Sequence, residues 1–260
     1  MIISIVTLIT LLISGNAEAF FITNFEKGVK EYVIEKDRKK EILSEAKTMT
    51  KFIKEYNKSR GKKLKEFKTI YESYTTGKED LDLFFNDLTE EQMKFQDQFI
   101  DGRLDLTKLL TEDEWGHIIE YSEQSLDKTR EKQEKKAKKS EKSNKSPKVL
   151  FEKTQNKVSK EIIDQDKAGR IIGSLDRLLG SYAKLIEQVA IVNVKDNDVL
   201  KKQNPEKEEF GLIYQEIDES RALVQKALIA FHEAVRENAD SSSGEKVLKT
   251  LTKDLELTVH

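Results

Sequence analysis

The chain has no cysteine in 260 residues, which excludes disulfide bonds and thiolate nucleophiles. Its only prolines are Pro147 and Pro205, so few positions force the backbone to turn. No stretch shows the period-two alternation of apolar and polar residues that marks a strand. Glycine-rich phosphate loops and the G-x-S-x-G nucleophile motif are missing. We therefore expect a protein that is not an enzyme and that has no cofactor.

What the chain does contain is charge in a helical pattern. Charged residues make up 36% and hydrophobic residues 37% of the sequence, with Lys, Glu and Leu abundant. Such a composition is typical of long helices with narrow apolar stripes. The net charge of −2 gives the whole chain no basic field for nucleic acid. The sequence predicts an all-α fold: long antiparallel helices in a hairpin or bundle with coiled-coil-like packing, divided into two helical subdomains.

The N-terminus indicates where the protein is located. Residues 2–13 form an uncharged apolar run that is followed by Ala17-Glu18-Ala19. This pattern predicts a signal peptide at residues 1–19, cleaved after Ala19, and export to the periplasm. Because no Lys or Arg precedes the run, two alternatives stay open. One is an uncleaved inner-membrane anchor at residues 1–22 with the bulk of the protein in the cytoplasm, and the other is a buried helix of a soluble protein.

An N-terminal helical domain is predicted at residues 24–127, and it begins with one long helix from Phe25 to Tyr74. Its apolar residues keep two heptad positions, one occupied by Ala46, Ile53, Phe67 and Tyr74 and the other by Met49, Tyr56 and Ile70. Arg60 and Lys63 interrupt this seam. We expect the helix to be buried on one side by its neighbours, with a free-standing dimeric coiled coil as the alternative. Thr75-Thr76-Gly77 then predicts a turn.

Two helix starts with the same pattern are predicted beyond this turn. In each, a threonine is the N-cap and a Gln or Glu three residues later bonds back to it, which is a capping box. Met93 and Trp115 would each pack on the leucine before the cap as a hydrophobic staple. The two sets of residues are candidates for capping and for binding a partner: Leu88, Thr89 and Gln92, then Leu110, Thr111 and Glu114.

Residues 128–148 break the composition, with ten basic residues, three acidic ones and almost no apolar ones. We interpret them as a solvated, basic linker, with contact to anionic lipid or nucleic acid as the alternative. A C-terminal helical bundle is predicted at residues 149–260. Two dense apolar stripes separated by Asn204-Pro205 predict two long helices. The segment from Ser241 to Gly244 predicts a loop before a short final helix.

One metal-site half-motif occurs in the chain. Glu114 and His117 form an E-x-x-H, which di-iron bundle proteins place on facing helices. A complete site needs a second E-x-x-H and two more glutamates, but His232 has Ile229 three residues before it. We therefore expect no metal site, and His117 to be a polar residue on a helix.

The paired boxes resemble a known signature. L-T-x-x-Q at residues 88–92, repeated as L-T-x-x-E at 110–114, is similar to the motif of the Spy/CpxP family of small all-helical periplasmic proteins. The resemblance covers residues 40–127, and Glu114 stands where the family motif has glutamine. It implies a helical hairpin cradle that binds unfolded or partner proteins without ATP.

The sequence as a whole favours a non-enzymatic helical protein of the envelope that binds other proteins as a chaperone or scaffold. The alternative is a membrane-anchored cytoplasmic coiled-coil protein whose segment 128–148 contacts lipid or nucleic acid. Membrane contact is expected through the N-terminus, a nucleic-acid partner is not expected, and the helical seams leave oligomerisation open.

Overall fold

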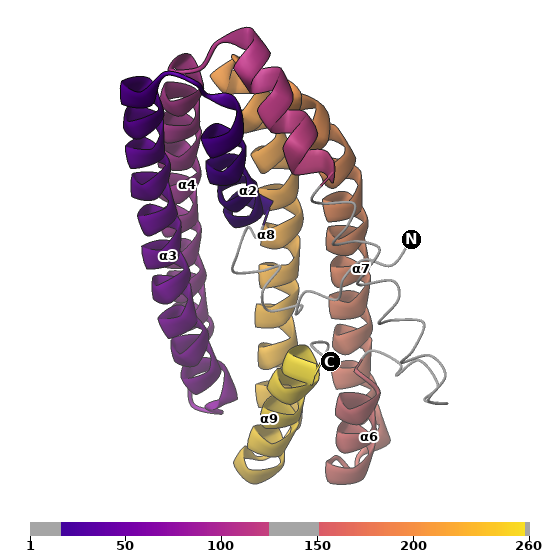
Figure 1. Cartoon of the computed structure of the whole chain (residues 1–260). Coiled ribbons are helices and arrows are strands. Elements are labelled where there is room, and N and C mark those ends of the chain that lie inside the picture. Colours follow the sequence, from indigo (N-terminus) through magenta and orange to yellow (C-terminus); the bar gives the residue numbers. More distant parts are fainter. Residues whose placement is uncertain (1–16, 125–150, 258–260) are drawn as a thin grey trace, which may run out of the picture.

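The computed structural model describes residues 17–124 and 151–257, and this part of the chain is built of helices and short connections, with no strand. The prediction of an all-α fold is confirmed. The helices are α2 (Ala17–Tyr32), α3 (Lys36–Glu72), α4 (Lys78–Lys108), a helix over 112–124, α6 (Glu152–Glu161), α7 (Gln165–Lys201), α8 (Lys207–Asn238) and α9 (Ser241–Leu257). The long helices α3, α4, α7 and α8 run side by side, in the antiparallel pairs α3–α4 and α7–α8 (Figure 1).

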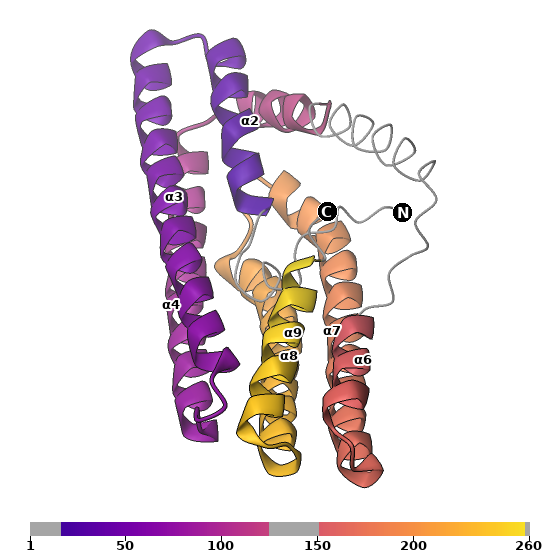
Figure 2. The same ribbon diagram turned by 90° about the horizontal axis from the view of Figure 1, so that it is seen from below.

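The shorter helices pack along these long ones. Helix α2 folds back on α3, and α6 and α9 lie against each other and against the lower ends of α7 and α8 (Figure 2). Helix α4 packs on α8 and α3 packs on α9, so the α3–α4 hairpin is joined to the C-terminal helices along its length. Within the described residues, no helix is both long and apolar enough to cross a membrane.

The prediction of a single helix from Phe25 to Tyr74 was wrong, because the chain reverses at residues 33–35. Val33 is buried and the next residue, Ile34, is almost fully exposed. Glu35 occupies the N-cap of α3 without a side-chain cap bond. The reversal therefore contains no glycine, proline or capping side chain by which the sequence could have revealed it. The turn predicted at Thr75-Thr76-Gly77 is confirmed.

The predicted helix start at Thr89 was also wrong, because α4 runs without a break from Lys78 to Lys108. The Thr89 hydroxyl instead donates to the carbonyl of Phe85, 2.9 Å away, as threonines inside helices do. No glycine or proline lies between Phe85 and Thr89, so the helix continues and keeps the backbone hydrogen bonds that a new start would give up.

In the C-terminal half the break at Asn204-Pro205 is confirmed, since α7 ends at Lys201 and α8 begins at Lys207. The loop predicted at Ser241–Gly244 was wrong, because these residues form the first turn of α9. The Asp240 carboxylate caps that turn by accepting a 3.0 Å bond from the Ser243 N–H. Gly244 is part of the helix, where it packs closely against Tyr74.

Two apolar cores hold the helices together. The smaller core joins α2, α3, α4 and the helix over 112–124 around Phe25, Phe99 and Trp115. The larger core takes Tyr71 and Phe84 from the N-terminal half, together with side chains of α6, α7, α8 and α9. The two predicted domains therefore share the larger core. Residues 1–16 and 128–148 lie outside the described residues, and Ala17-Glu18-Ala19 form the first residues of α2.

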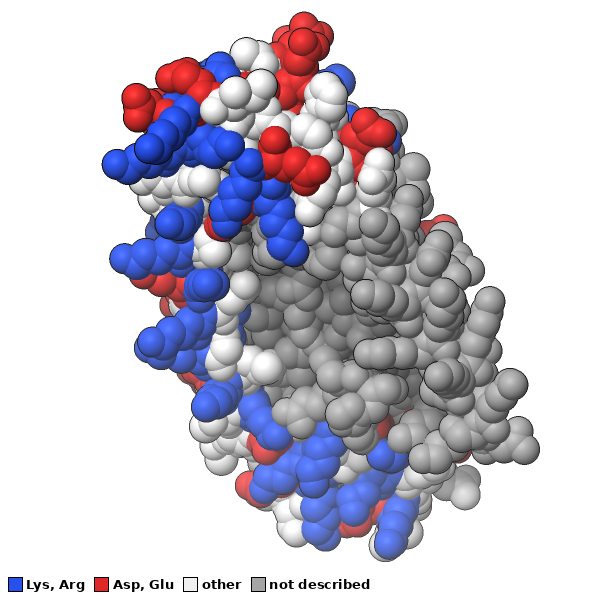
Figure 3. Space-filling model, viewed as in Figure 1, with Lys and Arg blue, Asp and Glu red and all other residues white. Residues whose placement is uncertain are grey.

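Charge is divided unevenly between neighbouring helices. Helix α3 carries thirteen basic and six acidic residues, a net charge of +7. Helix α4 beside it carries nine acidic and four basic residues, a net charge of −5. Basic side chains follow the outer edge of the molecule where α3 lies (Figure 3). A chain with a net charge of −2 thus has a strongly basic helix on its surface.

Candidate functional site

The candidate site is an open groove between α4 and α8, with a volume of about 700 Å³. Apolar side chains make up much of its lining, and three carboxylates and one lysine accompany them. Its lining residues are Met93, Gln96, Asp97 and Ile100 from α4 and Lys207, Gly211, Tyr214, Gln215, Asp218, Glu219 and Ala222 from α8.

Helical spacing explains why these residues meet. On α4 the lining residues recur at intervals of three and four from Met93 to Ile100, and on α8 they recur in the same way from Lys207 to Ala222. This spacing places each set on one face of its helix. The groove is open at Gly211, where a Cβ atom would meet nothing within 4 Å.

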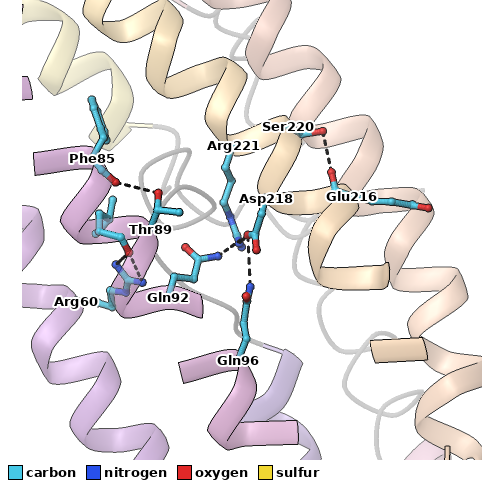
Figure 4. Close-up of polar contacts among 10 residues, drawn as sticks. Arg60, Phe85, Thr89, Gln92, Gln96, Glu216, Asp218, Ser220 and Arg221 are labelled. Carbon is cyan, nitrogen blue, oxygen red and sulfur yellow. Dashed lines mark hydrogen bonds and ion pairs between the residues drawn. The ribbon is translucent and has the colours of Figure 1, made fainter. Parts of the chain in front are cut away.

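A buried polar network forms beside the groove around Asp218 (Figure 4). The Oδ1 atom of Asp218 accepts hydrogen bonds from Gln92 Nε2 at 2.8 Å and Gln96 Nε2 at 3.4 Å. The Arg221 guanidinium donates to the same oxygen at 2.6 Å. Burial raises the pKa of Asp218, and the positive charges of Arg221 and Arg60 and the Gln96 hydrogen bond oppose that rise. Two glutamines of α4 are thus fixed to one carboxylate of α8.

Arg60 extends this network to α3. It is buried, and both of its terminal nitrogens donate to the carbonyl of Leu88 at 3.2 Å. Its guanidinium lies 4.6 Å from the ring centre of Tyr56, within the range of a cation–π contact. The seam that Arg60 was expected to interrupt is therefore continued by a buried arginine that donates to the Leu88 carbonyl.

At the end of the groove near the start of α8, Lys207 lies between two carboxylates of α4. Its Nζ is 2.6 Å from Asp97 and 2.8 Å from Asp101. Hydrogen bonds to Asp101 and Asp97 raise the pKa of Lys207 well above its ordinary value. Lys207 is thus paired with α4 and Asp218 with Arg221, and Glu219 is the lining carboxylate that has no ion pair among the described residues.

The first predicted box is divided between the core and the network. Leu88 lies in the larger core, and Thr89 bonds within its own helix. Gln92 does not cap a helix, because its amide is held by Asp218. Met93 was expected to pack as a staple, but 59% of its surface is exposed in the groove lining.

The second predicted box is confirmed as a capping box. The Thr111 N–H donates to Glu114 Oε2 at 2.9 Å, and the Glu114 N–H donates to the Thr111 hydroxyl at 3.3 Å. Leu110 and Trp115 are both buried in the smaller core. Glu114 also forms an ion pair with Arg38 of α3. The box lies away from the groove, since none of its residues lines it.

The E-x-x-H pair has other partners. Glu114 is engaged by the cap and by Arg38, and the exposed His117 has its Nδ1 atom 2.7 Å from the carbonyl oxygen of Asp113. In the part of the chain that the structure describes, no three His, Asp or Glu side chains are grouped to hold a metal ion.

Sequence reasoning missed Asp218, Arg221 and Tyr214. The sequence did contain one signal for Arg221: the apolar stripe of α8 passes from Ile217 to Val224, and Arg221 occupies the buried position between them. No such signal marked Asp218, whose role depends on the packing of α8 against α4.

Comparison of the chain with protein-family models, with curated proteins and with solved structures finds no match. The resemblance to the Spy/CpxP family therefore stays a prediction that rests on the second box and on the letters of the first.

Proposed function

We propose that this protein is a non-enzymatic helical protein of the cell envelope that binds another protein by holding a segment of it in the α4–α8 groove. The observation that carries the proposal is the groove itself: an open depression of about 700 Å³ whose lining includes an exposed methionine. Methionine side chains are flexible and polarisable, and surfaces that bind varied partners use them for that reason.

The charges of the groove favour a basic segment as its occupant. After the ion pairs with Lys207 and Arg221, the lining keeps the negative charge of Glu219, and α4 as a whole carries a net charge of −5. A partner segment would match the apolar lining if its apolar side chains contacted Met93 and Tyr214. Flanking Lys or Arg residues in that segment would match the negative charge of the groove. An unfolded basic protein presents many such segments.

The network around Asp218 supports a rigid binding surface more than a chemical reaction. One oxygen of its carboxylate already accepts from three side chains, and the two bonds from Gln92 and Gln96 fix α8 against α4. A groove whose walls are fixed in this way loses little conformational freedom when a partner binds.

The test is suppression of aggregation, with reduced lysozyme as a basic unfolded probe and light scattering as the readout. The protein is expected to suppress its aggregation, and Met93→Lys is expected to lose most of this effect. Leu83→Lys is the matched control, because Leu83 lies on the same helix, is 68% exposed and does not line the groove. A wild-type protein without suppression, or equal loss in both variants, would contradict the proposal.

A further inference from the structure

The outer face of α3 carries a row of lysines that the groove does not use. Helical periodicity of about 100° per residue places six of them within an arc of about 80°. They are Lys47, Lys51, Lys54, Lys58, Lys62 and Lys65. All six side chains are exposed, and the blue edge over α3 in Figure 3 contains this face. We call this set the lysine row.

The row differs from the basic residues of α3 that have structural partners. Lys63 is mostly buried and lies within 3.5 to 3.8 Å of Glu66, Asp87 and Glu91, so it ties α3 to α4. Among the described residues, one ion pair involves a member of the lysine row: the Nζ atom of Lys51 lies 3.9 Å from the exposed Glu55 carboxylate. Ion pairs with the described residues therefore leave most of the charges of the row uncompensated.

Such a row works against the stability of its own helix. Successive members are three or four residues apart, and like charges at this spacing repel one another. A helix face that serves only as a solvated surface normally mixes charges of both signs. Here, Glu55 is the one acidic residue between Ala46 and Lys65. An external partner of opposite charge would remove this repulsion.

The shape and chemistry of the row select among anionic partners. Lys36 and Lys40 continue the same face beyond the row toward the start of α3, and this whole face from Lys36 to Lys65 measures about 44 Å at 1.5 Å per residue. A straight row of this length can touch a flat surface at every lysine, whereas the strands of a nucleic-acid duplex curve away from it. The face has no arginine for bidentate phosphate recognition and no aromatic residue for base stacking.

We propose that the lysine row binds an anionic phospholipid surface, with α3 lying along the plane of the headgroups. Each lysine contributes by attraction to the negative surface potential, and no phosphate needs a dedicated pocket. The row lies on α3 and the groove on α4 and α8, so this inference goes beyond protein binding and does not depend on it.

The test is co-sedimentation of the full chain with phosphatidylcholine vesicles and with vesicles in which a third of the lipid is phosphatidylglycerol. The readout is the ratio of the two partition coefficients, because this ratio cancels any contact that is independent of lipid charge. The protein is expected to prefer the anionic vesicles, and the preference is expected to fall steeply with salt as the screening length shortens from about 10 Å at 0.1 M to about 3 Å at 1 M.

Two variants of equal charge change separate the row from net charge. K47Q/K54Q/K58Q/K62Q removes four members of the row, and K153Q/K160Q/K226Q/K253Q removes four exposed lysines elsewhere. At about fivefold per lysine, the row variant is expected to lose a hundredfold or more of its preference for anionic vesicles. The control variant is expected to keep most of it, and circular dichroism checks that both remain helical.

Three results would overturn the proposal. The first is equal binding of the wild-type protein to both kinds of vesicle, and the second is an equal loss in the two variants. The third is binding to a short DNA duplex that depends on the row without any preference for anionic vesicles. Aggregation suppression by the row variant is expected to match that of the wild type, so a failure of this proposal stays distinct from a failure of the groove.

Discussion

The side chain of Gln92 on α4 donates a hydrogen bond of 2.8 Å to Asp218 on α8, which joins two helices across 126 residues of sequence. Arg221 binds the same oxygen, and Gln96 approaches it from one helical turn beyond Gln92. This single carboxylate therefore aligns the wall of α4 with the wall of α8.

The network predicts that Asp218→Asn costs about 1–3 kcal/mol of the free energy of unfolding, because it removes the carboxylate charge that the buried Arg221 guanidinium binds. Adding Arg221→Met removes the arginine side of the same ion pair, so the double variant should be more stable than the sum of the single effects by about 0.5–3 kcal/mol. Urea unfolding of the four proteins measures this coupling. Strict additivity would show that the pair does not act as a unit.

The contact between Gly244 and Tyr74 predicts a steric effect. A Cβ atom at Gly244 would lie 2.5 Å from the Tyr74 ring, which its hydroxyl anchors to the carbonyls of Arg236 and Ala239. Gly244→Ala should therefore destabilise the protein by about 1–3 kcal/mol, as overpacking does.

The control is Gly173→Ala on α7, where a Cβ atom would meet nothing within 4 Å. This change should stabilise the protein by about 0.5–1 kcal/mol, because alanine favours a helix over glycine. Thermal unfolding of both variants gives the comparison, and shifts of the same sign would contradict it.

The two threonines of the predicted boxes should respond differently to the same change. Thr111→Ala removes a real N-cap and should cost about 1 kcal/mol. Thr89→Ala lies inside α4 and should be nearly neutral, since alanine's helix propensity offsets the lost bond to Phe85. Denaturant midpoints of the two variants measure the difference, and a cost at Thr89 equal to that at Thr111 would refute the assignment.

His232 predicts a pH dependence of stability. Burial, and then the charge of Arg236, lower its pKa below the ordinary 6.5, while hydrogen bonds to the backbone of Ser73 and Tyr71 oppose the shift. The native state thus binds the proton more weakly than the unfolded state. The contribution of neutral His232 to the free energy of unfolding is therefore complete above pH 6.5. It decreases as the pH falls below 6.5 toward the lower pKa of the native state.

His232→Gln should flatten this slope, although it lowers stability overall by disturbing the contact with Ser73. Urea unfolding at a series of pH values between 5 and 8 measures the slope in the wild type and in the variant, and an unaltered slope in His232→Gln would disprove the role of this side chain.

The two long C-terminal helices could be read from the sequence, and two of the buried arginines occupy gaps in apolar stripes that the sequence displays. Arg60 lies midway between Ile53 and Phe67 at the same heptad position, and Arg221 fills the matching gap in α8. An arginine in an apolar stripe indicates a buried charge that needs a partner. The partner could not be read, because the face of α8 that meets α4 is set by packing between distant segments.

Failures at helix ends had a different cause. The letters of a capping box are compatible with a helix interior, and at Thr89 the helix continues because no glycine or proline lies just before it. Conversely, the serines after Asp240 read as a loop but begin α9, because the Asp240 carboxylate caps them and a buried glycine lets the turn pack against Tyr74. Short-range patterns do not decide between competing backbone hydrogen bonds when tertiary contacts favour one outcome.

Trp115 is the chain's only tryptophan, and its indole N–H donates at 2.7 Å to the carbonyl of Lys201, the last residue of α7. Arg103 lies over the same ring and binds the carbonyl of Lys202. Tryptophan fluorescence of this protein therefore reports on the packing at the connection between α7 and α8. If the connection from α7 to α8 loosens before the helices melt, tryptophan emission will shift to the red while the circular dichroism signal is still unchanged.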